Sequence, residues 1–256
     1  MYDFKFNEFV DIVKRLRKEC PWDRVQTNDS IKAATIEEAH EVVEAIDNKD
    51  FDELRIELGD LLLHVVFHSV IAEQDGKFTL AEVIDSIQEK LIRRHPHVFG
   101  DAQIDNADDV KKNWEHIKLS EGRKSILEGV PKTLPALYRA YRLQEKASKV
   151  GFDWEKKSQV WDKVVEEINE LHHAENNETP EKIMEELGDL LFALTNYSRF
   201  LKINPEEALN KANSKFQRRF NYIERKFGEM NKNITESNLA ELDVFWEESK
   251  KFDKQE

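Results

Sequence analysis

Acidic residues at helical spacing form the most distinctive chemical pattern in the sequence. The segment Glu37-Glu38-Ala39-His40-Glu41 places carboxylates three and four residues apart, and Glu57-Leu58-Gly59-Asp60 places two more three residues apart. Residues at these spacings share one face of an α-helix. Carboxylates that converge from two neighbouring helices repel one another strongly unless a cation lies among them. We therefore expect a cation site formed by Glu38, Glu41, Glu57 and Asp60.

The same pattern occurs a second time. Glu166-Glu167-Ile168-Asn169-Glu170 and Glu186-Leu187-Gly188-Asp189 follow at a constant offset, since 166 − 37 = 129 and 189 − 60 = 129. With 52 acidic residues in the chain, one such stretch alone would usually be a solvated helix face. An ordered repeat instead indicates two homologous halves. The metal ligands expected in the second half are Glu167, Glu170, Glu186 and Asp189.

The ligand types favour magnesium. Oxygen ligands without thiolates select magnesium or manganese rather than zinc. The spacing of Glu37 and His40 leaves a di-iron site open, because ferritin-like bundles use a Glu-x-x-His motif. In the second half, however, Asn169 stands at the position of His40 and Ala193 at that of His64. The repeat keeps the oxygen ligands and loses the imidazoles, which favours magnesium.

A glycine precedes the aspartate in both halves. Gly59 and Gly188 interrupt segments that otherwise suit a helix. Glycine destabilises a helix by about 1 kcal/mol relative to alanine. We therefore expect close packing, or room for a ligand, beside these two residues.

Matched basic and aromatic residues lie later in each half. The basic residues are Lys215, Arg218 and Arg219 in the second half and Lys90, Arg93 and Arg94 in the first. Arginine suits bidentate contact with phosphate. A salt-bridged surface explains one such set equally well. Trp246 and Trp114 also match, and each could stack on a base or close a core.

The remaining sequence predicts the helices that must position these groups. Only 8 glycines and 6 prolines occur in 256 residues, and no segment alternates as a strand does. Capping residues predict helix starts after Asp50, Thr79, Thr179 and Asn204. Pro96 should end a helix that continues at the equivalent place in the second half. The short connection from Asp47 to Asp50, and a longer one from His172 to Thr179, should make the acidic helices antiparallel neighbours.

These features predict an all-α fold of two tandem homologous helical domains. We expect domains at 1–122 and 135–256, joined by a linker at 123–134 that contains Gly129 and Pro131. The net charge of −13 argues against stable nucleic-acid binding. The longest apolar run is too short to cross a bilayer, which takes ~20 residues. A single cysteine and the lack of a signal-like N-terminus suggest a cytoplasmic protein.

Three further motifs complete a resemblance to a known family. The segments are Cys20-Pro21-Trp22-Asp23-Arg24-Val25-Gln26-Thr27, Arg93-Arg94-His95-Pro96-His97-Val98-Phe99 and Gly151-Phe152-Asp153-Trp154. Together with the duplicated acidic motifs, they make nearly the full chain similar to MazG-type nucleoside triphosphate pyrophosphohydrolases of the tandem form. The resemblance implies an all-α NTP pyrophosphatase fold, with carboxylate-lined helix pairs in bundles, and a homodimer.

The resemblance also implies a reaction. A nucleoside triphosphate would be hydrolysed to the monophosphate and pyrophosphate with Mg²⁺, or Mn²⁺ in its place, and the second half would be the catalytic one. Our own hypothesis for the mechanism is attack of metal-activated water on the α-phosphorus, with Glu166 or Glu167 as the proton acceptor. The implied nucleotide-binding residues are Lys163, Glu166, Lys182, Glu185, Lys215, Arg218, Arg219 and Trp246, with Lys90, Arg93, Arg94 and Trp114 in the first half.

Two questions stay open at the level of sequence. The first half keeps all four acidic ligands, so it could be a second active site, a regulatory nucleotide site or a dimerisation unit. The alternative to an enzyme is a nucleotide-sensing protein that binds without turnover. No residue pattern indicates which base or sugar is preferred.

Overall fold

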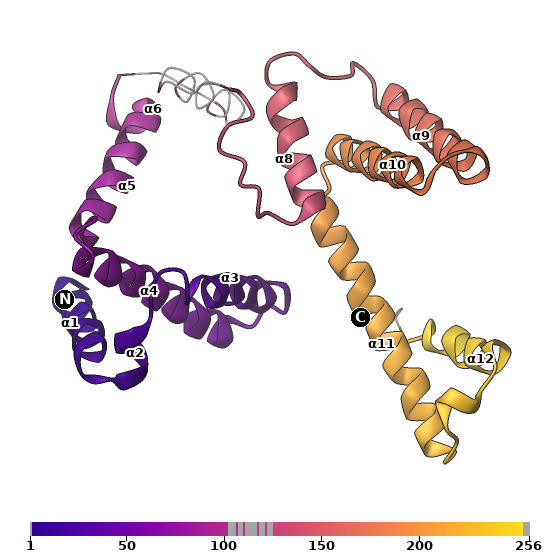
Figure 1. Cartoon of the computed structure of the whole chain (residues 1–256), viewed down its shortest axis with the longest axis horizontal. Coiled ribbons are helices and arrows are strands. Elements are labelled where there is room, and N and C mark those ends of the chain that lie inside the picture. The colour runs from indigo at the N-terminus through magenta and orange to yellow at the C-terminus, as the bar shows by residue number, and fades with distance from the viewer. Residues whose placement is uncertain are drawn as a thin grey trace. The chain divides into compact units, whose positions relative to one another are not determined.

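The computed structural model describes residues 2–101 and 125–252, and between them only Asn106, Val110, Ile117 and Glu121. Every regular element within this part of the chain is a helix (Figure 1), which confirms the all-α prediction. Two compact units are present, Met1–Asp109 and Val110–Glu256. The predicted linker at 123–134 has no helix among its described residues, 125–134. None of the described helices is both long and apolar enough to cross a membrane.

The first unit places its acidic motifs on two helices that pack along each other. Its elements are α1 (Tyr2–Glu19), α2 (Pro21–Val25), α3 (Lys32–Asp47), α4 (Phe51–Gln74), α5 (Leu80–Arg94) and α6 (Pro96–Phe99). Helix α4 is the centre of the unit, because α3, α1 and α5 all pack against it (Figure 1). The two acidic motifs lie on α3 and α4, and the packing of these helices brings the motifs together.

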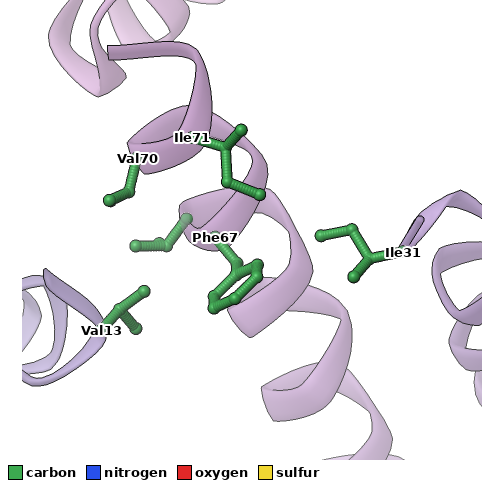
Figure 2. Packing of buried hydrophobic residues seen from close by; sticks show 6 residues of the cluster. Val13, Ile31, Phe67, Val70 and Ile71 are labelled. Atoms are coloured by element: carbon green, nitrogen blue, oxygen red, sulfur yellow. The ribbon is translucent and has the colours of Figure 1, made fainter. Parts of the chain in front are cut away.

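The core of the first unit lies at the C-terminal part of α4. Figure 2 shows Phe67, Val70 and Ile71 of α4 meeting Val13 of α1 and Ile31, which precedes α3. All of these side chains are buried. Burial of apolar side chains is the main favourable contribution to folding. This cluster therefore anchors the end of α4 that is distant in sequence from the acidic residues.

The second unit repeats the acidic helix pair and adds a long helix. Its elements are α8 (Ala136–Ser148), α9 (Lys157–Asn177), α10 (Pro180–Phe200), α11 (Pro205–Glu229), η1 (Ile234–Glu236) and α12 (Leu239–Ser249). Helices α9 and α10 pack along each other, α8 packs on α10 and α11, and α12 packs on α11 (Figure 1). An edge-to-face contact of Phe227 and Phe245, with ring centroids 5.5 Å apart, joins α11 to α12.

The predicted helix starts are confirmed by their capping hydrogen bonds. The side chain of Asp50 accepts hydrogen bonds from the amides of residues 52 and 53 at the start of α4. Thr79 and Glu82 form a complete capping box at α5. Thr179 and Asn204 each cap a helix whose first residue is proline. Capping satisfies amides that have no partner within the helix.

Two predictions concern where helices end. Helix α5 stops at Arg94, just before Pro96, whereas α11 continues to Glu229, as predicted. The long connection predicted from His172 is wrong, because α9 continues to Asn177 and only Glu178 and Thr179 join it to α10.

Candidate active site

The first half brings together three of its four predicted metal ligands. Glu38 and Glu41 of α3 and Glu57 of α4 each offer a carboxylate oxygen, and these oxygens lie within 4.8 Å of one another. The two helices are joined by only three residues, Asn48–Asp50, so their acidic faces meet. Asp60 is not part of this group of three, although its charge reaches Glu38.

Protons relieve the crowding of charge in this first-half cluster. Glu57 is only 8% exposed. Its burial, a hydrogen bond with Glu53 and the charge of Glu41 raise the pKa of Glu57 to about 7. Burial and the charges of Glu41 and Asp60 also raise the pKa of Glu38. Without a cation, Glu38 and Glu57 hold protons more tightly than ordinary carboxylates do.

The two histidines of α4 form a chain of polar contacts beside this cluster. His68 Nδ1 lies 2.7 Å from Asn28 Oδ1, and His68 Nε2 lies 2.8 Å from Thr35 Oγ1. Thr35 Oγ1 lies 2.9 Å from His64 Nδ1. The last of these polar contacts is between His64 Nε2 and Glu38 Oε1, which lie 3.7 Å apart. Burial and the neighbouring His64 lower the pKa of His68.

Neither metal-ligand group among the described residues includes a histidine. His40, the residue that suggested a di-iron site, is exposed. The all-oxygen groups therefore favour the magnesium interpretation over the di-iron one. The polar contacts of Thr35 and His64 could have been recognised by comparing the two halves of the sequence. At the equivalent positions the second half has Val164 and Ala193, which cannot form them.

The second half also brings three predicted ligands together, but a different three. Glu167 of α9 and Glu186 and Asp189 of α10 offer carboxylate oxygens within 4.8 Å of one another. Glu167 and Glu186 are buried, with 6% and 8% of their surface exposed. Glu170 stands outside this group, and desolvation together with the charge of Glu167 raises its pKa.

A pocket of about 540 Å³ opens over the second-half cluster. It is lined by Lys163, Glu166, Glu167, Asn169, Glu170, His173, Ala174, Glu178, Lys182, Glu186 and Asp189. This volume is typical of small-molecule sites. The acidic motifs do not predict His173 and Ala174. Their positions three and four residues after Glu170 on the same helix are the signal that identifies them.

Two lysines of the pocket pair with its glutamates. Lys163 Nζ lies 2.8 Å from Glu166 Oε1 and 2.8 Å from Glu167 Oε1. These hydrogen bonds raise the pKa of Lys163, so its ammonium group stays charged.

Lys182 makes the equivalent contacts from α10. Its Nζ lies 3.0 Å from Glu185 Oε1 and 2.8 Å from Glu186 Oε1, and these bonds raise the pKa of Lys182. Glu185, predicted to bind nucleotide, does not line the pocket.

The other predicted nucleotide-binding residues lie outside this pocket. Lys215, Arg218 and Arg219 are on α11 and Trp246 is on α12, and none of the four lines it. The Trp246 ring lies 5.5 Å from that of Phe216, and the Arg219 guanidinium lies 5.3 Å from the Trp246 ring. In the first half, Lys90, Arg93 and Arg94 are on α5, whereas the carboxylates are on α3 and α4. Trp114 lies outside the described residues.

The glycines before the two aspartates face open space. A Cβ atom added at Gly59 or Gly188 would meet nothing within 4 Å in the chain. The expectation of close packing at these positions is therefore wrong within the described chain. Room for a ligand beside them stays a prediction.

A divalent metal ion fits both carboxylate groups on chemical grounds. Each group offers three oxygens from two helices and includes at least one buried carboxylate. A buried carboxylate normally needs a charged or hydrogen-bonding partner. Hard oxygen donors of this kind suit magnesium or manganese.

Comparison with known proteins identifies the family. The model of the MazG nucleotide pyrophosphohydrolase domain matches the chain twice, at residues 26–99 and 156–223. A Thermotoga maritima protein named nucleoside triphosphate pyrophosphohydrolase/pyrophosphatase MazG is 46% identical over 96% of this chain and 95% of its own. The Escherichia coli K12 nucleoside triphosphate pyrophosphohydrolase is 41% identical over 96% of this chain and 97% of its own.

A solved structure also aligns with part of the chain. It is the crystal structure of a mazG-related protein from Thermotoga maritima, with a TM-score of 0.40 and 26% identity over 44% of this chain and 98% of that one. The family assignment therefore rests on the sequence matches, which confirm the resemblance drawn from the motifs and the expectation of an enzyme of this class. The chain therefore belongs to the MazG nucleotide pyrophosphohydrolase family.

Proposed function

We propose that this chain hydrolyses nucleoside triphosphates to the monophosphate and pyrophosphate, with magnesium, at the second-half cluster. The observation that carries the proposal is the pocket on α9 and α10. Three clustered carboxylates and two lysines line this pocket. Carboxylates suit a metal ion and ammonium groups suit phosphate, and a metallonucleotide needs both.

Glu167, Glu186 and Asp189 would hold the metal ion, with Glu170 beside them in the pocket. Magnesium bound there supplies two things, a lower pKa for the attacking water and its orientation toward the α-phosphorus. Manganese, with the same preference for oxygen, should substitute. The first-half cluster would hold a metal ion through Glu38, Glu41, Glu57 and Asp60.

Glu166 is the better candidate of the two predicted proton acceptors. Its side chain is 55% exposed and lines the pocket, whereas Glu167 is buried within the group of three. A carboxylate that is not occupied by metal can accept the proton of the attacking water. As the water oxygen bonds to the α-phosphorus, the bond between that phosphorus and the α–β bridging oxygen breaks. Its electron pair leaves with pyrophosphate, beside Lys163 and Lys182.

A homodimer is the assembly that we propose for this enzyme. The α10 residues Leu187, Leu191 and Leu194 form an apolar stripe, and each is more than 40% exposed. The α4 residues at the same offset of 129, Leu58, Leu62 and Val65, are exposed to a similar degree. Apolar stripes of this kind mark interaction surfaces. Light scattering should give twice the mass of the 30.2 kDa chain, and a monomer at micromolar concentration would refute this assembly.

Product analysis tests the proposed reaction. The protein is incubated with each nucleoside triphosphate and magnesium in ¹⁸O-labelled water, and the products are identified by mass spectrometry. We expect the monophosphate, carrying the ¹⁸O, and unlabelled pyrophosphate. Label in pyrophosphate would place the attack on the β-phosphorus, and diphosphate with orthophosphate would contradict the reaction. Binding without products would support the nucleotide-sensing alternative.

A further inference from the structure

Two ammonium groups pair with carboxylates of the candidate metal group in the second half. Lys163 Nζ lies 2.8 Å from Glu167 Oε1, and Lys182 Nζ lies 2.8 Å from Glu186 Oε1. Glu167 and Glu186 are two of the three residues in the candidate metal group. One lysine comes from each helix of the pair, so each helix carries its own counter-ion for its buried carboxylate.

The lysines approach these carboxylates from the solvent side. The side chains of Glu167 and Glu186 are 7% and 10% exposed, whereas those of Lys163 and Lys182 are 36% and 41% exposed. A lysine carries its charge on a flexible four-carbon stem. Each ammonium group can therefore leave its carboxylate and stay within the pocket without any movement of the helix backbone.

The fold of the helix pair does not itself require these lysines. With the offset of 129, the first-half residues at their positions are Ala34 and Glu53, since 163 − 129 = 34 and 182 − 129 = 53. The first half nevertheless forms the same pair of packed helices with a carboxylate cluster. The lysines are therefore a property of the second-half site.

We propose that Lys163 and Lys182 are exchangeable counter-ions of the second-half carboxylates. In the metal-free protein their ammonium groups pair with Glu167 and Glu186, and when a divalent cation binds they turn to the phosphates of the substrate. This inference rests on the proposed function, since it assumes a divalent cation at these carboxylates and a polyphosphate beside them.

The exchange couples the binding of metal and nucleotide. The ammonium groups and the divalent cation compete for Glu167 and Glu186, so the lysines weaken the binding of metal alone. A polyphosphate that takes up the ammonium groups removes this competition and strengthens metal binding. By linkage, bound metal strengthens nucleotide binding by the same factor.

Manganese binding tests the exchange without any need for turnover. Binding of Mn²⁺ to the full chain is measured by electron paramagnetic resonance, in a background of Glu57→Gln and Asp60→Asn that disables the first-half cluster. Lys163→Met and Lys182→Met should each tighten Mn²⁺ binding about tenfold without nucleotide, because a competing charge at close range is gone. The same variants should weaken binding of an α,β-imido nucleoside triphosphate, which has no hydrolysable α–β bond.

Two control variants separate exchange from simpler effects. Lys226→Met removes the same charge from an ion pair with Glu229 on α11, outside the pocket, and should leave Mn²⁺ affinity unchanged. Lys163→Arg keeps the positive charge and should keep the weak metal binding of the parent. Thermal unfolding of each variant confirms that it is folded.

The outcomes distinguish this inference from the proposed function. If neither methionine variant binds Mn²⁺ more tightly than the Lys226→Met control, exchange is refuted, even if the enzyme releases pyrophosphate. If both variants bind Mn²⁺ more tightly but the parent protein cleaves no nucleoside triphosphate, exchange stands and the proposed function fails.

Discussion

The two halves offset the repulsion among their clustered carboxylates in different ways. Both gather three carboxylate oxygens within 4.8 Å on a pair of packed helices. The first half has no lysine at the positions of Lys163 and Lys182, and its Glu57 has a pKa raised to about 7. The second half instead holds two ammonium groups within 3.0 Å of its glutamates.

This difference indicates what each half is suited to do. Charge in the first half is relieved by protons and bordered by a chain of contacts through Thr35, His64 and His68. Charge in the second half is offset by the ammonium groups of Lys163 and Lys182, which line the pocket and suit phosphate. A carboxylate cluster alone can hold metal, but turnover of a polyphosphate also requires groups that stabilise its charge.

The largest expected effect is the loss of activity in the second half. Glu186→Gln and Asp189→Asn should each lower the rate of pyrophosphate release by about 100-fold or more. Substitution of residues that only hydrogen-bond to metal ligands already lowers activity about 10- to 100-fold, and these two residues are proposed as ligands themselves. Glu57→Gln and Asp60→Asn should have smaller effects. A coupled pyrophosphate assay measures all four variants. If only the first-half pair abolished activity, the roles of the halves would be reversed.

The next effect is a pH dependence that arises in the first half. The pKa of Glu57 is about 7 in the folded protein and near 4.5 when unfolded. Between these values the folded state holds a proton that the unfolded chain has lost, so this group makes stability fall as pH rises from about 4.5 to 7. Thermal unfolding in EDTA from pH 4.5 to 8 should show this fall.

Glu57→Gln is the variant that isolates this contribution. The stability of this variant should depend less on pH between about 4.5 and 7, because no carboxylate is left to ionise at that position. Above pH 7 the metal-free variant should therefore be more stable than the metal-free parent. Added magnesium should stabilise the parent more than the variant. An unchanged pH profile in the variant would show that Glu57 is not the group responsible.

A smaller effect is expected in the contact chain of the first half. Thr35→Val, which introduces the residue found at the equivalent position 164, removes the hydroxyl between His64 and His68. We expect a loss of roughly 1 kcal/mol in the free energy of unfolding. Urea titration measures this loss, and pyrophosphate release should be unchanged. A large loss of turnover would tie the contact chain to catalysis.

The smallest effect comes from transferring a counter-ion to the first half. Ala34→Lys places a lysine four residues before Glu38, as Lys163 is placed before Glu167. We expect a gain of about 0.3 kcal/mol in metal-free stability at pH 8, within the range for an ion pair at this helical spacing. Ala34→Met is the uncharged control. An equal gain in both variants would point to packing rather than to charge.

The sequence predicts much of this architecture because its signals are local. Capping side chains such as Thr79 and Asn204 act within three residues, and Pro96 ends the helix α5 that precedes it. The convergence of Glu167 with Glu186 also follows from helical spacing and the antiparallel pairing of their helices, although the connection is shorter than predicted.

Other features depend on side-chain conformation or on surroundings that no spacing rule contains. Which three of four carboxylates approach most closely differs between the halves, with Asp60 outside one group and Glu170 outside the other. The bridging by Lys182 of two glutamates is likewise a matter of how a long side chain lies. That Trp246 contacts Phe216 and Arg219, and does not line the pocket, depends on the packing of α12 on α11.

The two-residue connection between α9 and α10 has a consequence for how the site forms during folding. Each acidic site is made by one helical hairpin, Lys32–Gln74 or Lys157–Phe200, so its contacts are close in sequence. Contacts of low sequence separation form fast. Lys163 and Lys182 pair with glutamates of their own helices, so each helix of the second hairpin carries a counter-ion before the hairpin closes. The first hairpin must instead take its balancing charge, a proton or a metal ion, from solution.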